Sequence, residues 1–169
     1  ESIVVVKGNP VYDSREGCNA IIETKTNSLI CGCKSTIIPE SVTEIKSGAF
    51  YERTSLESIV IPEGVMIIGT GAFTQCISLK DIVIPKSVQK IDLGAFSECA
   101  GLQEVVIPEG VTSIGERAFN YCTGLQKIVI PESVTSIESC AFESCTALQE
   151  VVIPEGVTSI GGCAYYNCT

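Results

Sequence analysis

Cysteine is the residue type with the most potential chemistry in this 169-residue chain, which contains 10 of them. Two Cys-x4-Cys pairs, Cys140 with Cys145 and Cys163 with Cys168, superficially suggest a four-thiolate zinc site. On a helical turn, however, side chains five positions apart point about 140° away from each other. The four thiols therefore cannot converge on one ion, and we predict no metal and no other cofactor.

Five of the cysteines recur at one position, 23 residues apart, and are expected to form a column. Parallel Cβ vectors on neighbouring turns of the chain give poor disulfide geometry, so we expect buried free thiols. Two pairs outside this column remain candidate disulfides in an oxidising environment, Cys140 with Cys163 and Cys18 with Cys31. The members of the column are Cys76, Cys99, Cys122, Cys145 and Cys168.

Catalytic chemistry is difficult to assemble from the remaining side chains. The chain has no His, so neither a Ser-His-Asp nor a Cys-His site can form within it. Tyr12, Asp13 and Arg15 are the only polar cluster outside the repeat pattern, and a loop contact explains them more simply than an active site. We therefore predict that the protein is not an enzyme.

The charge and hydropathy of the chain exclude several classes of partner. With 11 basic against 20 acidic side chains, the net charge is −9, which argues against nucleic acid and anionic membranes. No apolar run reaches about 18 residues, so we expect no membrane insertion. The 45% apolar content predicts a folded chain, and its start at Glu1 rather than Met indicates a portion of a longer protein.

An internal repeat of 23 residues organises the chain. Its unit reads L-x-x-I-V-I-P-E-x-V-x-x-I-G-x-x-A-F-x-x-C-x-x and runs without insertion from residue 33 to the end. Such regular spacing predicts a solenoid, because one unit cannot bury its apolar face alone. The repeat is marked by Pro39, Pro62, Pro85, Pro108, Pro131 and Pro154.

Each unit is expected to contain three pieces. The Ile-Val-Ile step, as at 59–61, predicts a short β-strand that the following proline ends. A turn then leads to Val-x-x-Ile, as at 111–114, which returns two aliphatic side chains to the core. The next segment, such as 116–122, predicts one helical or 3-10 turn with Ala, Phe and Cys inside. Strands of successive units should pair in parallel, about 4.8 Å apart.

We predict a single solenoid domain over residues 1–169, in which residues 1–32 form a partial repeat. Residues 18–24 and 28–31 are expected to form an inserted β-hairpin in place of the helical turn. Residues 33–169 supply six 23-residue repeats, the last one truncated. Neither end carries a polar capping unit, so self-association through uncapped ends is one hypothesis.

The strand alternation predicts one exposed column of side chains. In Ile-Val-Ile the outer two residues point inward and the middle one points outward. An apolar column with polar flanks has the form of a protein-binding surface, and the alternative is that strands simply favour β-branched residues. The outward column is Val4, Ile37, Val60, Val83, Val106, Val129 and Val152, and the residues two positions earlier are Ser2, Ser35, Ser58, Asp81, Glu104, Lys127 and Glu150.

A further, mostly acidic column follows the prolines. Carboxylates of this kind could bind Ca²⁺, but a single Glu on each turn gives too few ligands, so we favour a solvated acidic face. Its members are Glu40, Glu63, Lys86, Glu109, Glu132 and Glu155.

The unit resembles the BspA-like leucine-rich repeats of the treponemal type, on the joint pattern of Leu, Ile-x-Ile-Pro, Val, Ile-Gly, Ala-Phe and Cys over 33–169. Residues 9–33 also resemble an insert found in members from gut anaerobes. The resemblance implies an α/β fold: a right-handed solenoid with a parallel sheet on the concave face and short helical or 3-10 turns on the convex side. It also implies a secreted or cell-surface adhesion protein without catalytic residues.

These observations lead to a functional hypothesis of a non-catalytic binding scaffold, extracellular or on a cell surface. Its concave sheet would bind a protein or glycan, such as a host extracellular matrix protein. The alternative is a structural spacer or a self-associating repeat array. The residues expected to bind are Val60, Val83, Val106, Val129, Val152, Asp81, Glu104, Lys127 and Glu150.

Overall fold

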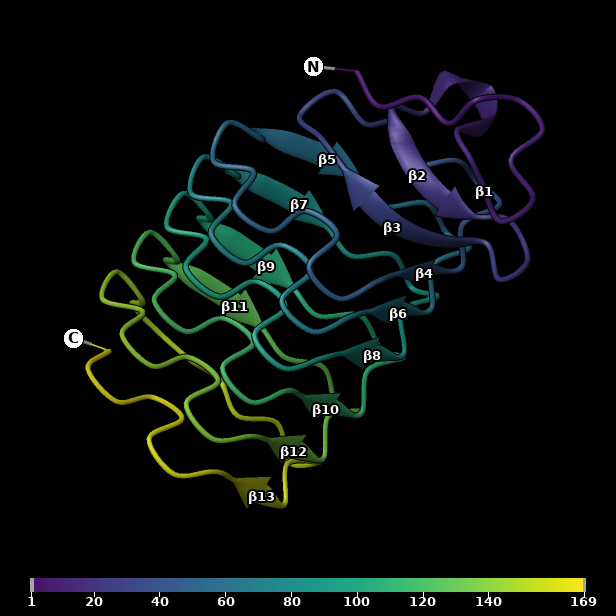
Figure 1. Cartoon of the computed structure of the whole chain (residues 1–169). Coiled ribbons are helices and arrows are strands. Elements are labelled where there is room, and N and C mark those ends of the chain that lie inside the picture. Colours follow the sequence, from purple (N-terminus) through teal and green to yellow (C-terminus); the bar gives the residue numbers. More distant parts are fainter. Residues whose placement is uncertain (1, 169) are drawn as a thin grey trace.

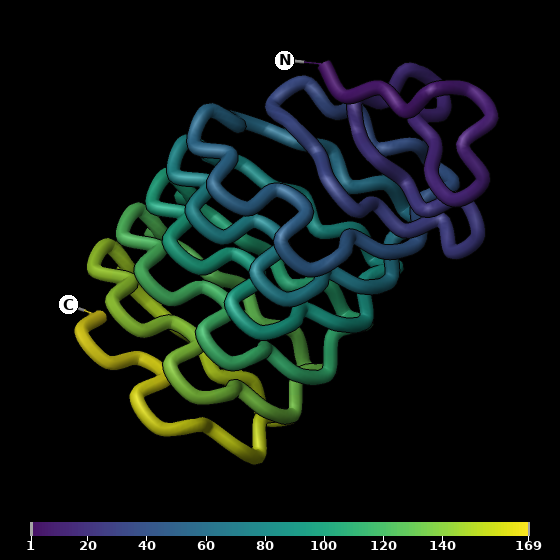
Figure 2. Tube along the Cα trace, viewed as in Figure 1, coloured from purple at the N-terminus to yellow at the C-terminus, as the bar shows by residue number. Residues whose placement is uncertain are grey.

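A computed structural model describes residues 2–168, so Glu1 and Thr169 lie outside the described residues. The chain coils into stacked turns, here called rungs, that advance steadily from one end of the molecule to the other (Figures 1 and 2). Short parallel strands from successive rungs join into sheets. The architecture is the solenoid that the 23-residue period predicts.

The first sheet is built from the Ile-Val-Ile steps. Its four parallel strands follow the order β11-β9-β7-β5, and equivalent residues of successive repeats lie opposite each other, as Ser58 does with Asp81. A proline two residues beyond each strand ends the ladder, because proline has no N–H to donate. The strands are β5 (Ser58–Val60), β7 (Asp81–Val83), β9 (Glu104–Val106) and β11 (Lys127–Val129).

A second sheet, which the sequence analysis did not predict, forms where the Val-x-x-Ile segments return to the core. It contains nine strands, and the repeats contribute two residues each, paired in parallel as Ile114 with Ile137. The described chain contains one short 3-10 helix, η1 (Arg15–Gly17), beside this sheet. The strands are β1 (Tyr12–Asp13), β2 (Ala20–Glu23), β3 (Ser28–Gly32), β4 (Glu44–Ile45), β6 (Ile67–Ile68), β8 (Lys90–Ile91), β10 (Ser113–Ile114), β12 (Ser136–Ile137) and β13 (Ser159–Ile160).

The segment that follows each second-sheet strand is a run of tight turns, which corrects the predicted helical or 3-10 turn. Two positions per repeat have φ in the left-handed region, as at Gly94 (60°) and Glu98 (60°). The Phe96 N–H donates to Ala118 O of the next rung at 2.8 Å, whereas the Ser97 N–H donates to Gly94 O at 2.9 Å. Because alternate N–H groups bond between rungs, the continuous bonds of a helix cannot form.

Aromatic rings stack through the interior of the solenoid. Neighbouring ring centroids lie between 5.0 Å and 5.6 Å apart, with interplanar angles of 10° or less. All five phenylalanine rings are fully buried. The core is therefore continuous along the axis, because each ring touches its equivalent in the next rung. The stack consists of Phe50, Phe73, Phe96, Phe119, Phe142 and Tyr165.

The strands β2 and β3 form an antiparallel hairpin over the first regular rung, and β3 continues into the parallel ladder with β4. Gly32 occupies the place of the repeated phenylalanine: its N–H donates to Ala49 O at 2.8 Å, as a Phe N–H does elsewhere. A Cβ on Gly32 would lie 2.2 Å from the Phe50 ring. The stack of rings therefore ends against a glycine backbone, which explains why the hairpin carries no side chain there.

Candidate binding surface

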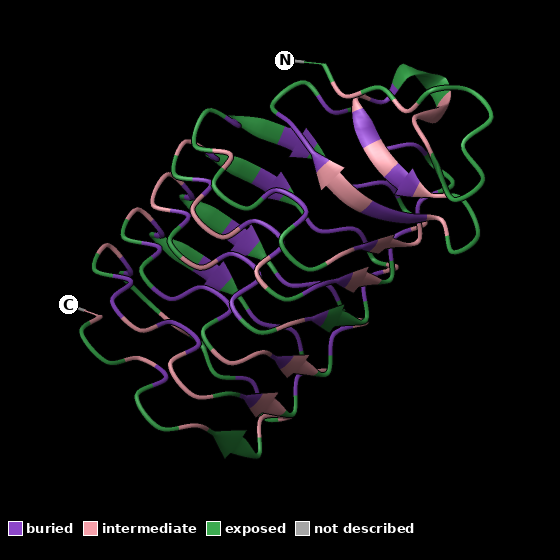
Figure 3. Cartoon of the chain, viewed as in Figure 1, coloured by how far each residue is buried: buried purple, intermediate pink, exposed green. Residues whose placement is uncertain are grey.

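The outward column predicted from the strand alternation is exposed, and four of its members, Val60, Val83, Val106 and Val129, lie on the solvent-facing side of the first sheet, whereas Val4, Ile37 and Val152 lie outside its strands. Val60 is 80% exposed and Val106 is 51% exposed, whereas the adjoining Ile59 and Val105 are buried. Figure 3 shows this alternation along β5, β7, β9 and β11, whose outer residues are green and whose middle residues are purple. The apolar residues of this column are therefore accessible and take no part in the core.

The surface of the sheet is hollowed over three rungs. A groove of about 690 Å³ lies over β7, β9 and β11. Val83, Val106 and Val129 form its floor, and Pro108 and Pro131 lie along one side. We call this feature the valine groove. Covering one of these valines with an apolar ligand group would be worth about 1–2 kcal/mol, because part of each side chain is already shielded.

A second, smaller hollow continues the valine groove toward the next rung. Its volume is about 320 Å³, and Lys127, Val129, Glu150 and Val152 line it. Asp81, Val83, Glu104 and Val106 line the valine groove itself. The structure thus brings eight of the nine residues predicted to bind into two adjoining hollows, while Val60 lies outside both. Their role in binding remains a prediction.

Charged side chains border the valine groove on both sides. Asp81 and Glu104 precede the valines along the strands, and Lys127 donates to Glu104 Oε1 across one rung at 2.8 Å. This ion pair is exposed, so it contributes at most about 1 kcal/mol and is weakened by salt. The groove therefore combines an apolar floor with charged edges.

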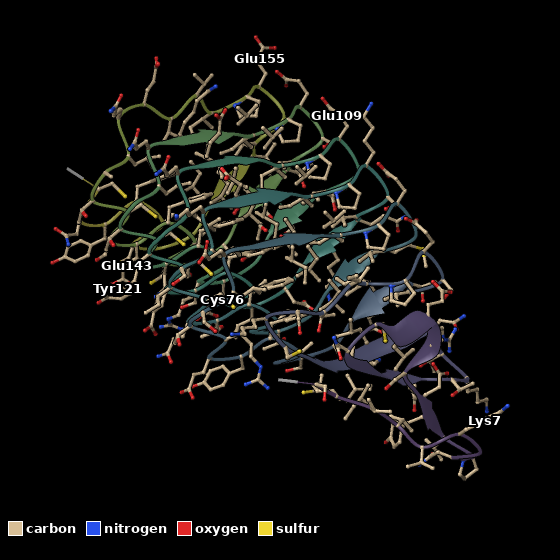
Figure 4. All side chains as sticks on the ribbon, turned by 90° about the horizontal axis from the view of Figure 1, so that it is seen from above. Lys7, Cys76, Glu109, Tyr121, Glu143 and Glu155 are labelled. Carbon is tan, nitrogen blue, oxygen red and sulfur yellow. The ribbon has the colours of Figure 1, made fainter. Side chains whose placement is uncertain are left out.

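The second edge of the valine groove is lined by Lys86, Glu109 and Glu132, which belong to the column that follows the prolines. These side chains are exposed, so the column is a solvated face that also borders the groove. Figure 4 shows Glu109 and Glu155 together on one side of the solenoid, away from Tyr121 and Glu143.

The cysteine column lies inside the solenoid, as predicted, and has a specific bonding role. Each thiol donates to the carbonyl oxygen of the phenylalanine 26 residues earlier, as Cys99 does to Phe73 O at 3.0 Å. Burial raises the pKa of the Cys76 thiol to about 12 and that of Cys122 well above its ordinary value. In the rung nearest the hairpin, Arg53 Nε donates to Gly32 O at 2.9 Å instead. The column is therefore structural.

Cys18, Cys31, Cys140 and Cys163, which lie outside this column, form no disulfide in the structure. Cys140 and Cys163 occupy left-handed positions (φ 57° and 59°) of adjacent rungs, where the first three repeats have glycine and the fourth has Arg117. Cys31 lies opposite Ile21 in the hairpin, not opposite Cys18. Among the described residues, no group of three or more His, Cys, Asp or Glu side chains could hold a metal ion.

The polar cluster at the N-terminal end is a structural network. Arg15 donates to Asp13 through Nε at 2.8 Å and Nη2 at 2.7 Å, and its Nη1 donates to Asn27 Oδ1 at 2.8 Å. Thr24 Oγ1 donates to the same Asp13 carboxylate. The hydrogen bond from Arg15 lowers the pKa of Asp13 to about 2. These bonds join β1 to the hairpin, whereas Tyr12 contributes an exposed ring.

Residues 21–149 match the family described as BspA type leucine rich repeat region, in 6 copies. A leucine rich cell surface protein from Faecalibacterium prausnitzii A2-165 is 46% identical, with a TM-score of 0.71 over 77% of this chain and 35% of its own. A search of the curated proteins finds no match. No described helix has the length and apolar character needed to span a membrane.

Two more distant solved structures agree in fold. A leucine-rich repeat protein from Eubacterium ventriosum is 22% identical, with a TM-score of 0.79 over 99% of this chain and 52% of its own. The T. pallidum leucine rich repeat protein is 25% identical, with a TM-score of 0.62 over 87% of this chain and 84% of its own. This chain thus spans about a third of the Faecalibacterium protein (35%) and about half of the Eubacterium protein (52%). Since the family match covers most of the residues and the fold agrees with it, the chain belongs to the BspA-type leucine-rich repeat family.

Proposed function

We propose that this protein is a non-catalytic binding scaffold, extracellular or on the bacterial cell surface, whose valine groove binds a protein or glycan such as a host extracellular matrix component. The family and the fold are typical of binding scaffolds rather than enzymes. The Faecalibacterium neighbour is described as a cell surface protein, which supports the location.

One observation supports this function most strongly. Three valines from successive rungs stay exposed at the bottom of a single groove, while the residues beside them in the strands are buried. A groove with an apolar floor and polar edges has the composition of protein-recognition surfaces. Folding does not require these side chains to be apolar, because they contact solvent.

The test compares two matched triple variants for binding to a panel of immobilised extracellular matrix proteins and to a glycan array. The first replaces the groove floor by Val83→Lys, Val106→Lys and Val129→Lys. The control places the same charges on exposed apolar residues outside the groove, by Met66→Lys, Ile77→Lys and Leu93→Lys. We expect the groove variant to lose at least about tenfold in binding while the control does not change. Equal binding by both variants would refute the assignment of the groove.

A second function, a spacer or self-associating array, would depend on contacts between copies of the chain, and its support is the stacking of like rungs through parallel strands. Light scattering over a concentration series tests this, because association should raise the mass as the concentration rises. A mass that stays monomeric at every concentration would rule out the array.

A further inference from the structure

The edges of the valine groove carry an excess of negative charge. Four carboxylates line the groove, those of Asp81, Glu104, Glu109 and Glu132, against the single ammonium of Lys86. Within the described chain, only Glu104 of these four forms an ion pair, with Lys127. Asp81, Glu109 and Glu132 therefore form no ion pair among the described residues, and with Lys86 and Lys127 both counted the edges still have four carboxylates against two ammonium groups.

The chemistry of the lining also limits the kinds of ligand that fit. None of the 14 residues that line the groove is aromatic, so no ring is available to stack on a sugar or a base. A neutral, polar ligand would cover the valine floor without replacing the water contacts of its own hydroxyl groups. An anionic ligand would meet the carboxylates on both sides.

We propose that the valine groove binds a cationic amphipathic segment of a protein, in which apolar side chains cover the valines and flanking Lys or Arg residues reach the two acidic edges. This inference rests on the proposed function and narrows its ligand from protein or glycan to one class of peptide. Charge complementarity is the argument for it: the unpaired carboxylates lie on both sides of the floor, and the whole chain has a net charge of −9. Arg suits this role, because its planar guanidinium pairs with carboxylates through two hydrogen bonds.

The test is a selection from a displayed library of random 12-residue peptides on the immobilised protein. Each recovered peptide is then measured against the triple Lys variant of Val83, Val106 and Val129, and against the Met66, Ile77 and Leu93 control. Peptides that bind the control but not the groove variant define the groove ligands. We expect these peptides to combine Leu, Ile, Val or Phe with at least two Lys or Arg residues.

A second pair of substitutions isolates the charge from the apolar floor. Glu109→Gln and Glu132→Gln together remove two carboxylates without changing the shape of the edge. The double substitution should lower the affinity for the recovered peptides roughly tenfold at low salt. The difference should diminish as salt is added, because exposed charges are screened.

The outcomes separate the inference from the function on which it rests. The proposal of a cationic ligand would be refuted if the groove-dependent peptides were neutral or acidic. It would also be refuted if they bound equally well after Glu109→Gln and Glu132→Gln. In both cases the groove would still be a binding site. A selection that recovers no peptide would overturn the cationic peptide ligand alone. Recovered peptides that bind all three proteins equally, together with matrix-protein and glycan binding that the triple Lys variant leaves unchanged, would contradict the groove itself and the proposed function with it.

Discussion

Two columns of side chains run along this solenoid, and they differ in how much the residue type varies from rung to rung. Inside, the same phenylalanine recurs on successive rungs and each ring stacks on the next at 5.0–5.6 Å. Outside, valine recurs on the first sheet, but the residue two positions earlier changes from rung to rung. Those changing residues are Ser58, Asp81, Glu104, Lys127 and Glu150.

The difference shows where the fold constrains the sequence. An interior residue touches its own equivalent in both neighbouring rungs, so a change in one rung leaves a cavity or a clash in two others. An outward residue also lies beside its equivalents on the neighbouring strands, but its outer side faces solvent, so a change there neither opens a buried cavity nor forces a clash in the core. The constancy of the interior is therefore explained by packing, whereas the charges around the valine groove are free to follow a ligand.

The largest difference between buried and exposed side chains should appear in the reactivity of the cysteine thiols. Burial raises the pKa of Cys76 to about 12 and keeps reagent away from its thiol. Exposed Cys163 should therefore be alkylated by iodoacetamide much faster than Cys76, on the order of a hundredfold or more, as followed by peptide mass spectrometry. In denaturant all ten cysteines should react alike. Equal labelling of Cys76 and Cys163 in the native protein would show that the column is open to solvent.

The aromatic stack should provide the largest loss of stability. Phe96→Ala is expected to lower the free energy of unfolding by about 3–5 kcal/mol, because it opens a cavity between two stacked rings. Val106→Ala, on the neighbouring rung but facing outward, should change it by less than about 0.5 kcal/mol. Urea unfolding followed by circular dichroism measures both, and comparable losses would contradict the division between the columns.

The polar network at the hairpin should contribute less to the free energy of unfolding than the aromatic stack does, and its contribution should depend on pH. Asp13→Asn is expected to cost about 1–2 kcal/mol at pH 7, an amount discounted for the partial exposure of the ion pair. Since the folded pKa is lowered from 3.8 to about 2, the stabilisation is present above pH 4 and is lost as the pH falls toward 2. Unfolding curves of wild type and variant should therefore converge at low pH. A gap that stays constant with pH would indicate that packing, not charge, is lost.

Much of the fold could be predicted from the sequence, because the period, the prolines and the strand alternation each have a local physical cause. The turn segment could not. Its residues are good helix formers, but bonds such as that from Phe96 N to Ala118 O connect positions that become neighbours only when rungs stack. The second sheet was missed for the same reason, since two-residue strands have no pattern of their own.

The floor of the candidate site could be predicted from the sequence, but the edge that follows the prolines could not. The outward valines follow from the period of two in a strand. The edge formed by Glu109 and Glu132 depends on how the chain turns after each proline, which determines whether a side chain leans over the sheet or away from it. That direction is a property of the folded rung and not of the residue type.

The central claim is that folding does not depend on the outward valines, which leaves them available to a ligand. Val106→Thr and Val111→Thr make the same substitution twice in one rung, at an exposed position and at a fully buried one. The free energy of unfolding of each variant tests the claim directly. We predict a change within about 0.5 kcal/mol for Val106→Thr and a loss of roughly 1–3 kcal/mol for Val111→Thr, where the hydroxyl is buried in the core. Equal losses at the two positions would contradict the account.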